Sequence, residues 1–318
     1  MNSSSPTLRA LAALLLVLAL GAVFPGDNHA FYHVDLHLDL LGTQSVVGIT
    51  AIGQCLVILG GGIDLSVGAV VGFTGMVFAG LQLQAGWPWP MAMAVALIAG
   101  AAFGAFNGLL VARLRVQPFL ATLATMVIAR GLARYVPELA GLAPSAKFQP
   151  ADGAGPAFWS ALAGHVGPVP VTGLLFALCA VTAAVWLQRS VFGRHLLATG
   201  GNPEAARLSG VATRRVLATT YVLSGVFAAL AAVFQVVRNV QGDPSAGELL
   251  ELQTIAAVVV GGTSLQGGRG SLWLAVLGVL TLALLDKVLS LNGLATHWRG
   301  CIQGVIILVA VLMQERRR

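Results

Sequence analysis

The sequence predicts an all-α fold, a polytopic membrane helical bundle with about ten transmembrane helices. Only 9% of the 318 residues are Asp, Glu, Lys or Arg, whereas 57% are hydrophobic. Soluble domains carry about 25% charged residues, so a soluble fold could not cover its surface with so few charges. The mean hydropathy is +0.86, and the 39 glycines allow close helix packing, which favours a helical bundle over a β-barrel.

Ten apolar runs approach the ~20 residues that a helix needs to cross the bilayer. No other stretch is long and polar enough to form a separate soluble domain, so residues 1–318 are expected to form one domain. The first run could instead be a cleaved signal peptide, because the sequence before Phe31 resembles a small-residue cleavage site. The runs lie near residues 10–25, 44–60, 63–84, 89–112, 118–136, 169–188, 214–237, 251–264, 270–290 and 297–314.

The positions of the basic residues predict that both termini face the cytoplasm. With ten crossings and the N-terminus inside, most of the 18 basic residues fall on cytoplasmic segments, and such an excess sets membrane orientation. The net charge of +6 therefore does not indicate a nucleic-acid-binding protein, since the basic residues lie where short loops meet apolar runs. The cytoplasmic set comprises Arg9, Arg113, Arg115, Arg189, Arg194, Arg207, Arg214, Arg215, Arg269 and Arg316 to Arg318.

Two apolar runs are broken by glycine-rich stretches at related places, which predicts interrupted helices near 60–66 and 261–270. The two stretches read ILGGGIDLSVGAVVGF, from Ile58, and VVVGGTSLQGGRGSLWLAVLG, from Val258. Irregular backbone at membrane depth is tolerated mainly where it is buried or lines a cavity, so such stretches point to a transport path. Glycine-rich runs also resemble one another by composition alone, and this alternative stays open.

Asp64 lies inside the first glycine-rich stretch, between apolar flanks. The preferred interpretation is a cap, in which the carboxylate accepts backbone N–H groups where the helix restarts. In the alternative, Asp64 or Ser66 contacts a polar solute. Uncharged polar residues in other apolar runs would suit a hydroxyl-rich solute, or would equally hydrogen-bond one helix to another. The candidates for a translocation path are Gln54, Asp64, Ser66, Asn107, Thr122, Thr125 and Thr254.

The sequence predicts neither a metal site nor a catalytic residue. His29, His33 and His37 recur at steps of four and could share one face of a helix that holds a divalent metal, but no helix is established there, so a polar external surface is the preferred interpretation. The three cysteines lie in apolar runs without paired spacing, which argues against a zinc site or a disulfide framework. No GxxxxGK[ST] phosphate loop occurs, so any ATP must bind another subunit.

One polar island, GGNPEAARLSG from Gly200, contrasts with its apolar surroundings. Gly200-Gly201 are expected to form a flexible approach to a short helix. Asn202 is a good N-cap, Pro203 suits the first helical position, and Gly210 suits the position after the helix. A helix of about two turns is too short to be stable alone, so packing or a partner must hold it. A loop helix lying on the membrane is the alternative.

Four motifs, in this order and spacing, resemble the membrane permease subunit of ribose-, xylose- and galactoside-type ABC sugar importers. The resemblance covers roughly residues 44–314. It implies two permease subunits, identical or different, in the lipid of the bacterial inner membrane, two cytoplasmic ATPase subunits and a periplasmic sugar-binding protein. It also implies a permease without catalytic residues or cofactors. The motifs are GGGIDLSVGAVVG, NGLLVARLRVQPFLATLATMVIARG, GGNPEAARLSGV and IAAVVVGGTSLQGGRGS.

The resemblance further implies that residues 199–212 are the coupling segment that docks on the ATPase. Glu204-Ala205-Ala206 and Gly210 reproduce the EAA-x3-G opening of the broader importer motif, while its I-x-L-P ending is absent around Thr220 to Leu223. The residues expected to couple the permease to the ATPase are Gly201, Asn202, Pro203, Glu204, Ala205, Ala206, Arg207 and Gly210.

The expected function is thus ATP-driven import of a pentose or hexose. A related importer permease for branched-chain amino acids or nucleosides, and an autonomous secondary transporter, are the alternatives. Ion-coupled carriers place ionisable residues in the membrane path, and few are available here, with adjacent Asp286 and Lys287 as the main exception.

Overall fold

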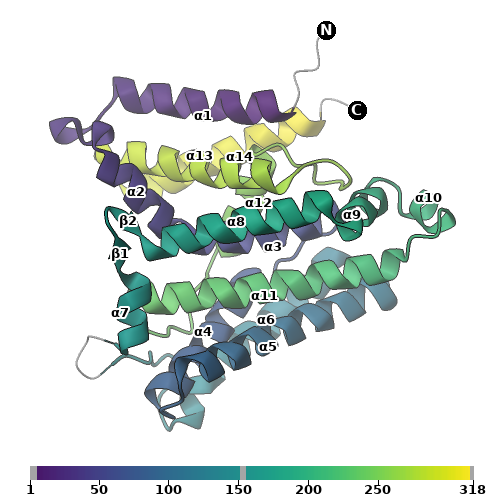
Figure 1. Cartoon of the computed structure of the whole chain (residues 1–318), viewed down its shortest axis with the longest axis horizontal. Helices are drawn as coiled ribbons and strands as arrows, with labels where there is room; N and C mark the ends of the chain where they lie inside the picture. Colours follow the sequence, from purple (N-terminus) through teal and green to yellow (C-terminus); the bar gives the residue numbers. More distant parts are fainter. Residues whose placement is uncertain (1–5, 151–154, 316–318) are drawn as a thin grey trace.

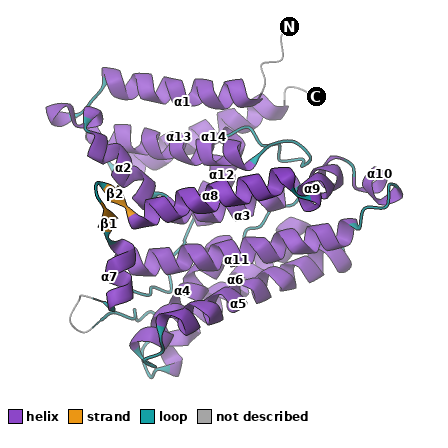
Figure 2. Cartoon of the chain, viewed as in Figure 1, coloured by secondary structure: helices purple, strands orange, loops and turns teal. Residues whose placement is uncertain are grey.

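The computed structural model describes residues 6–150 and 155–315, and nearly all of the regular structure is helical (Figure 2). Among the described residues, five helices are long and apolar enough to cross a membrane, and a sixth span results if a helix pair bent by 53° counts as one. The chain is therefore a multi-pass all-α membrane bundle. The five spans are Trp89–Arg113 (α5 with η2), Pro118–Leu139 (α6), Val171–Arg189 (α8), Thr213–Asn239 (α11) and Leu272–Leu291 (α13), and the bent pair is Val34–Thr43 (α2) with Ser45–Leu59 (α3).

Several shorter elements complete the bundle. The helices α4 and α12 are apolar but span only 17 and 11 residues, because each borders an interruption. The sole strands of the described part form a two-residue antiparallel hairpin. These elements are Pro6–Val23 (α1), Asp27–Tyr32 (η1), Val67–Leu83 (α4), Ala157–Ala163 (α7), His165–Val166 (β1), Val169–Pro170 (β2), Val191–Gly201 (α9), Pro203–Leu208 (α10), Leu250–Val260 (α12) and Thr296–Glu315 (α14).

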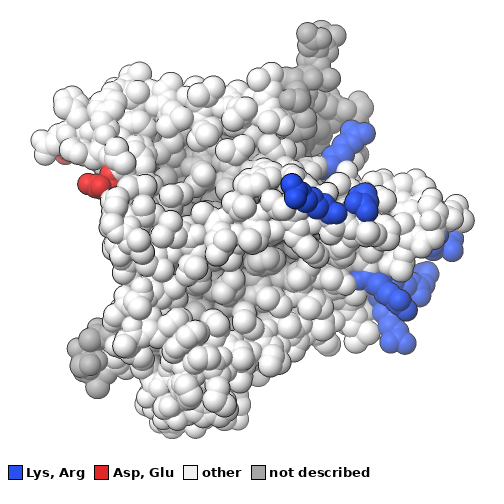
Figure 3. Space-filling model, in the orientation of Figure 1, with Lys and Arg blue, Asp and Glu red and all other residues white. Residues whose placement is uncertain are grey.

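The bundle has two distinct ends (Figure 1). One end carries α9 and α10, and we refer to it as the α10 end. The other carries η1, α7 and the β1–β2 hairpin, and we refer to it as the hairpin end. On the face drawn in Figure 3, Lys and Arg side chains gather at the α10 end and acidic side chains are visible at the hairpin end. On this face of the bundle, basic and acidic side chains therefore lie at opposite ends.

Helix α11 is the centre of the bundle and packs on α3, α4 and α5. Its contact with α5 is backbone to backbone, since a Cβ atom added at Gly100 or at Gly225 would collide with the carbonyl oxygen of the other glycine. The close packing expected from the glycine content is confirmed at this crossing.

Both predicted interruptions are confirmed. Helix α3 ends at Leu59 and α4 begins at Val67, while α12 ends at Val260 and α13 begins at Leu272. Each interrupted stretch therefore has the same order of helix, irregular segment and helix, although the second irregular segment extends one residue beyond the predicted boundary.

The histidine triplet does not lie on one helix. His29 belongs to η1 and has a left-handed φ of 54°, whereas His33 precedes α2 and His37 lies within it. The chain turns between them, so the metal alternative lacks the shared helix face that it requires. Among the described residues, no group of three or more His, Cys, Asp or Glu side chains is placed to hold a metal ion.

The loops at the hairpin end are tied together. Phe148 and Gly242 exchange two backbone hydrogen bonds of 3.0 and 2.9 Å, and Lys147 Nζ lies 2.7 Å from Asp243 Oδ2. Burial alone would raise the pKa of Asp243, but hydrogen bonds from Lys147 and Ser245 outweigh it and lower the pKa. The carboxylate therefore stabilises the fold above its unfolded-state pKa, and that contribution is lost as the pH falls through the lowered value.

The α5–α11 crossing gives a first testable prediction. We expect Gly225→Leu to lower the free energy of unfolding by about 3 kcal/mol, because the added side chain must separate two backbones. Thermal unfolding of the purified protein in detergent measures the effect. Gly131→Leu is the matched control, since Gly131 has no neighbouring atom within 4 Å of an added Cβ. Equal unfolding midpoints for the two variants would contradict the packing argument.

Candidate functional site

The polar island folds as the short helix α10, and its start follows the prediction. Asn202 is the N-cap, and its side-chain oxygen accepts hydrogen bonds from the backbone N–H groups of Glu204, at 3.1 Å, and Ala205, at 2.9 Å. Pro203 occupies the first helical position, where its missing N–H costs nothing. The N-terminus of α10 is therefore specified locally.

The end of α10 is closed by a Schellman motif. Gly210 N donates to Arg207 O and Val211 N donates to Ala206 O, each at 3.0 Å. Gly210 has a φ of +85°, which favours glycine, so the predicted role of Gly210 is confirmed. A helix of six residues is thus capped at both ends without help from the bundle.

Helix α10 projects from the bundle as its outermost element at the α10 end (Figure 1). Ala206 is its buried residue, while Glu204, Arg207 and Leu208 are exposed. Leu208 is 76% exposed, although leucine is an apolar residue on an otherwise polar segment. The sequence reasoning missed Leu208, because a leucine at this position reads simply as a residue that continues the helix. Its exposure instead favours a partner surface on this helix.

The residues before α10 correct one expectation. Gly200-Gly201 do not form a flexible approach, because they are the last two residues of helix α9. A Cβ atom added at Gly200 would collide with the carbonyl oxygen of Leu59 and lie 2.6 Å from Gly268 N. Both glycines are therefore helical, and Gly200 provides close contact rather than flexibility.

Gly200 lies where both interruptions meet. Gly268 N donates a hydrogen bond of 2.9 Å to Leu59 O, and a Cβ atom at Gly267 would lie 2.7 Å from Gly61 N. Three segments that are far apart in the sequence therefore touch through their backbones, and we refer to this contact as the glycine junction, comprising residues 59–61, 200–201 and 267–268. The end of α9 is in direct contact with both irregular segments.

The first interruption is held by hydrogen bonds to Asp64. Its Oδ1 accepts from the backbone N–H of Ser66, at 2.9 Å, and from the Ser66 hydroxyl, at 2.6 Å. Its Oδ2 accepts from the hydroxyl of Ser224 on α11, at 2.9 Å. Asp64 is not the helix cap that the capping interpretation expected, because the N-cap of α4 is Ser66, which lacks a side-chain cap hydrogen bond. The carboxylate instead holds the turn before α4 and ties the interruption to the central helix.

Two further path candidates support the same segment. Asn107 on α5 donates from Nδ2 to the Ser66 hydroxyl, at 2.9 Å, and the hydroxyl of Thr122 on α6 accepts from Leu65 N, at 3.1 Å. Four of the seven candidates, Asp64, Ser66, Asn107 and Thr122, thus form one cluster around the interruption.

Comparison with known proteins decides the family. A family model described as the permease component of branched-chain amino acid transport systems matches residues 36–311. The chain belongs to this permease family. No solved structure matches the chain.

The permease also has similar relatives of full length. It is 36% identical to the ribose import permease protein RbsC of Escherichia coli strain K12, over 98% of this chain and 94% of the relative. It is 37% identical to RbsC of Bacillus subtilis strain 168, over 88% and 84% of the two chains. It is 33% identical to the xylose transport system permease protein XylH of Escherichia coli strain K12, over 87% and 84%.

The other three path candidates in this permease are Thr125, Thr254 and Gln54, and the two threonines bond within their own helices. The hydroxyl of Thr125 donates to Ala121 O in its own helix, at 3.0 Å, and that of Thr254 donates to Glu251 O, at 2.9 Å. Gln54 lies on α3 and, like the other six candidates, is buried. The structure has two cavities at the hairpin end, around the start of α12, and an apolar crevice between α3 and α8. Within the described part of the chain, none of the seven candidates lines any of these three spaces. Contact of these residues with a solute therefore stays a prediction.

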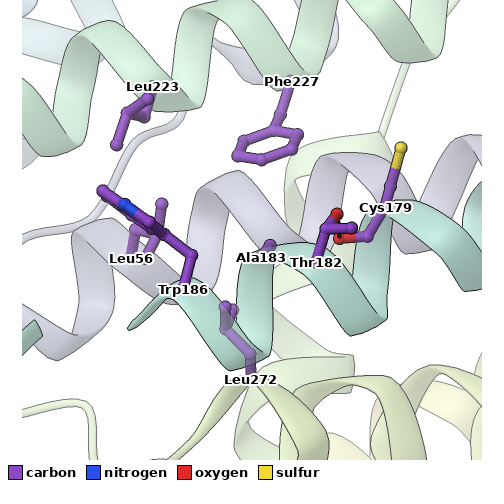
Figure 4. A pocket seen from close by; sticks show the side chains of 8 residues that line it. All are labelled: Leu56, Cys179, Thr182, Ala183, Trp186, Leu223, Phe227 and Leu272. Carbon is purple, nitrogen blue, oxygen red and sulfur yellow. Dashed lines mark hydrogen bonds between the residues drawn. The ribbon is translucent and has the colours of Figure 1, made fainter. Parts of the chain in front are cut away.

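The crevice of about 300 Å³ between α3, α8, α11 and α13 is apolar (Figure 4). Trp186, Leu223 and Phe227 point into it, and the hydroxyl of Thr182 is already bonded to Leu178 O, at 2.7 Å. This crevice offers an apolar surface and does not suit a hydroxyl-rich solute.

The Asp64 cluster gives a second prediction. We expect Asp64→Ala to lower the free energy of unfolding by about 3 kcal/mol, because buried donors on Ser66 and Ser224 lose their acceptor. Chemical denaturation of the purified permease measures this change, and Asp35→Ala, at an exposed position of α2, is the control. Normal stability combined with lost transport would instead assign Asp64 to the solute.

Proposed function

We propose that the chain is the membrane permease subunit of an ATP-driven importer for a monosaccharide, a pentose or a hexose. Its relatives are named for ribose and xylose. The observation that carries the proposal is the exposed helix α10, which is capped at both ends. It follows directly after Gly200-Gly201, which end α9 and belong to the glycine junction. Such a helix suits the coupling of an external motor to the membrane segments.

We place the subunit in the bacterial inner membrane with the α10 end in the cytoplasm. The Lys and Arg side chains at that end support this orientation (Figure 3). Helix α1 begins and α14 ends at the same end, which suits two cytoplasmic termini (Figure 1). Ten crossings result if the pair α2–α3 and the helices α1, α4, α5, α6, α8, α11, α12, α13 and α14 each count as one.

The proposed partners follow from this orientation. Two cytoplasmic ATPase subunits engage the coupling segments, residues 199–212, and a second permease subunit, identical or different, completes the path through the lipid. A periplasmic sugar-binding protein delivers the cargo at the hairpin end. Residues 1–318 act as one transmembrane domain, with Gly201, Asn202, Pro203, Glu204, Ala205, Ala206, Arg207 and Gly210 as the coupling residues.

The glycine junction gives the mechanism a physical route. Closure of the ATPase subunits displaces α10, and the displacement passes through Asn202 to Gly200 at the end of α9. Because Gly200 touches the backbones of Leu59 and Gly268, the motion reaches both interrupted stretches together. ATP shifts the access equilibrium only by making different contacts in the two states, and α10 presents those contacts.

The cargo class is tested with the binding protein that works with this permease. Binding of ribose, xylose, galactose, leucine and adenosine to that protein, measured by calorimetry, separates sugars from the amino acids that the family description names and from nucleosides. Preferential binding of a sugar supports the proposal, and binding of leucine or adenosine alone contradicts it. Transport by the purified permease without an ATPase would instead indicate a secondary transporter.

Helix α10 gives a third prediction. We expect Glu204→Ala and Gly210→Leu to abolish stimulation of ATP hydrolysis by the loaded binding protein while membrane insertion continues, because they alter the docking helix. Gly293→Leu is the control for Gly210→Leu, since Gly293 also has a positive φ, +74°, and open space, but lies at the hairpin end. Coupled uptake in both α10 variants would overturn the assignment of the coupling segment.

The glycine junction gives a fourth prediction, in which a glycine inside the junction is compared with one outside it. We expect Gly200→Ala to stop uptake, because the added methyl group collides with Leu59 O and separates the three segments. Gly131→Ala leaves uptake intact, because its added Cβ meets no atom within 4 Å. Uptake in proteoliposomes that contain the complete importer measures both, and equal activity would contradict transmission through this contact.

A further inference from the structure

Two adjoining cavities lie at the hairpin end on either side of the first turns of α12. The smaller has a volume of about 280 Å³ and lies between α3, α11 and α12. The larger has a volume of about 560 Å³ and lies between α12, α13 and α14. Val47 and Gln253 line both cavities, so the two adjoin, and we refer to the pair as the α12 depression.

The smaller cavity is rich in neutral and paired polar groups. Gln235, Arg238, Asn239, Glu248 and Gln253 line it and supply both hydrogen-bond donors and acceptors. Arg238 Nη1 is fixed by the carbonyl oxygens of Gly42, at 3.0 Å, and Thr43, at 2.8 Å. The side-chain oxygen of Gln235 is buried and accepts no hydrogen bond from the described residues. A buried acceptor beside a cavity is available to a ligand.

The larger cavity combines a neutralised polar end with apolar walls. Arg299 Nη1 donates to Asp286 Oδ2, at 2.8 Å, and Gln303 Nε2 donates to Asp286 Oδ1, at 3.2 Å. Asp286, the ionisable exception in the sequence, is therefore paired, and it offers no isolated charge to a coupling ion. Ala256, Val279 and Leu282 supply apolar surface in the same cavity.

We propose that the α12 depression is the outer sugar site of the permease, the place that receives the monosaccharide from the binding protein. This inference rests on the proposed function. A sugar carries donors and acceptors around its ring but no net charge. This matches a site where Arg299 is paired with Asp286, Arg238 is held by backbone carbonyl oxygens, and amide side chains supply further donors and acceptors. A wholly apolar solute would leave these polar groups without partners.

The position of the depression also connects it to the glycine junction. Gln253 and Gly261, where the second interruption starts, are separated by about 12 Å along the axis of α12. The same helix thus contacts the cargo at its start and the irregular segment at its end. The buried candidates of the first interruption then hold the backbone, while Gln235 and Gln253 contact the solute.

The test uses the complete importer in proteoliposomes, with D-ribose and D-xylose as probes. Gln235→Leu and Gln253→Leu keep approximate volume and remove hydrogen bonding. We expect each to lower the ratio of sugar imported to ATP hydrolysed about tenfold, which corresponds to one lost hydrogen bond. Gln235→Glu retains the acceptor and restores the ratio. Gln188→Leu, at an exposed position on α8 near the α10 end, is the matched control and keeps the wild-type ratio.

The outcomes separate this inference from the proposed function. Wild-type ratios in both leucine variants, while the unaltered importer transports a pentose, would overturn the α12 depression alone. Equal loss in Gln188→Leu would also overturn it, because the effect would not depend on the cavity. If the unaltered importer transports leucine and neither pentose, both the sugar site and the sugar function are overturned.

Discussion

The backbone contact between Gly200, Leu59 and Gly268 is the constraint on which the rest of the structure depends. Irregular backbone inside a membrane must find its hydrogen bonds within the protein, because lipid offers none. Here the two irregular segments meet this requirement partly with each other, since Gly268 N donates to Leu59 O. A side chain on any of these glycines would separate the segments, so the absence of a Cβ atom permits the arrangement.

The hydrogen bonds of Asp64 also help to satisfy the backbone of the first irregular segment. One carboxylate accepts from Ser66 within the interruption and from Ser224 on α11. Because α11 also packs closely on α5, the irregular segment is fixed to the central helix of the bundle. The polar residues buried around it therefore stabilise a broken helix, which a continuous apolar helix would not need.

Local signals in the sequence predict the helices, the interruptions and both ends of α10, because the residues that decide them are neighbours in the chain. Asn202 and Gly210 cap a helix whatever surrounds it. The segments of the glycine junction are separated by 68 to 209 positions in the sequence. The hydrogen bond from Ser224 to Asp64 joins residues that are 160 positions apart. No periodicity in the sequence reveals such distant contacts. For the same reason Gly200-Gly201 read as a flexible approach, although they end helix α9 and Gly200 lies against the backbones of Leu59 and Gly268.

The proposed sugar site and the contact that receives motion from α10 lie at opposite ends of one element. Helix α12 has 11 residues, which is about 16 Å of regular helix, and a helix of this length moves as a rigid body more readily than it bends. Displacing the glycine junction then changes the α12 depression. Because the coupling free energy between two sites is reciprocal, sugar bound in the α12 depression shifts the conformational equilibrium of the glycine junction by the same amount. Under the proposed function, cargo bound at the hairpin end thereby biases α10 toward the conformation that the ATPase recognises.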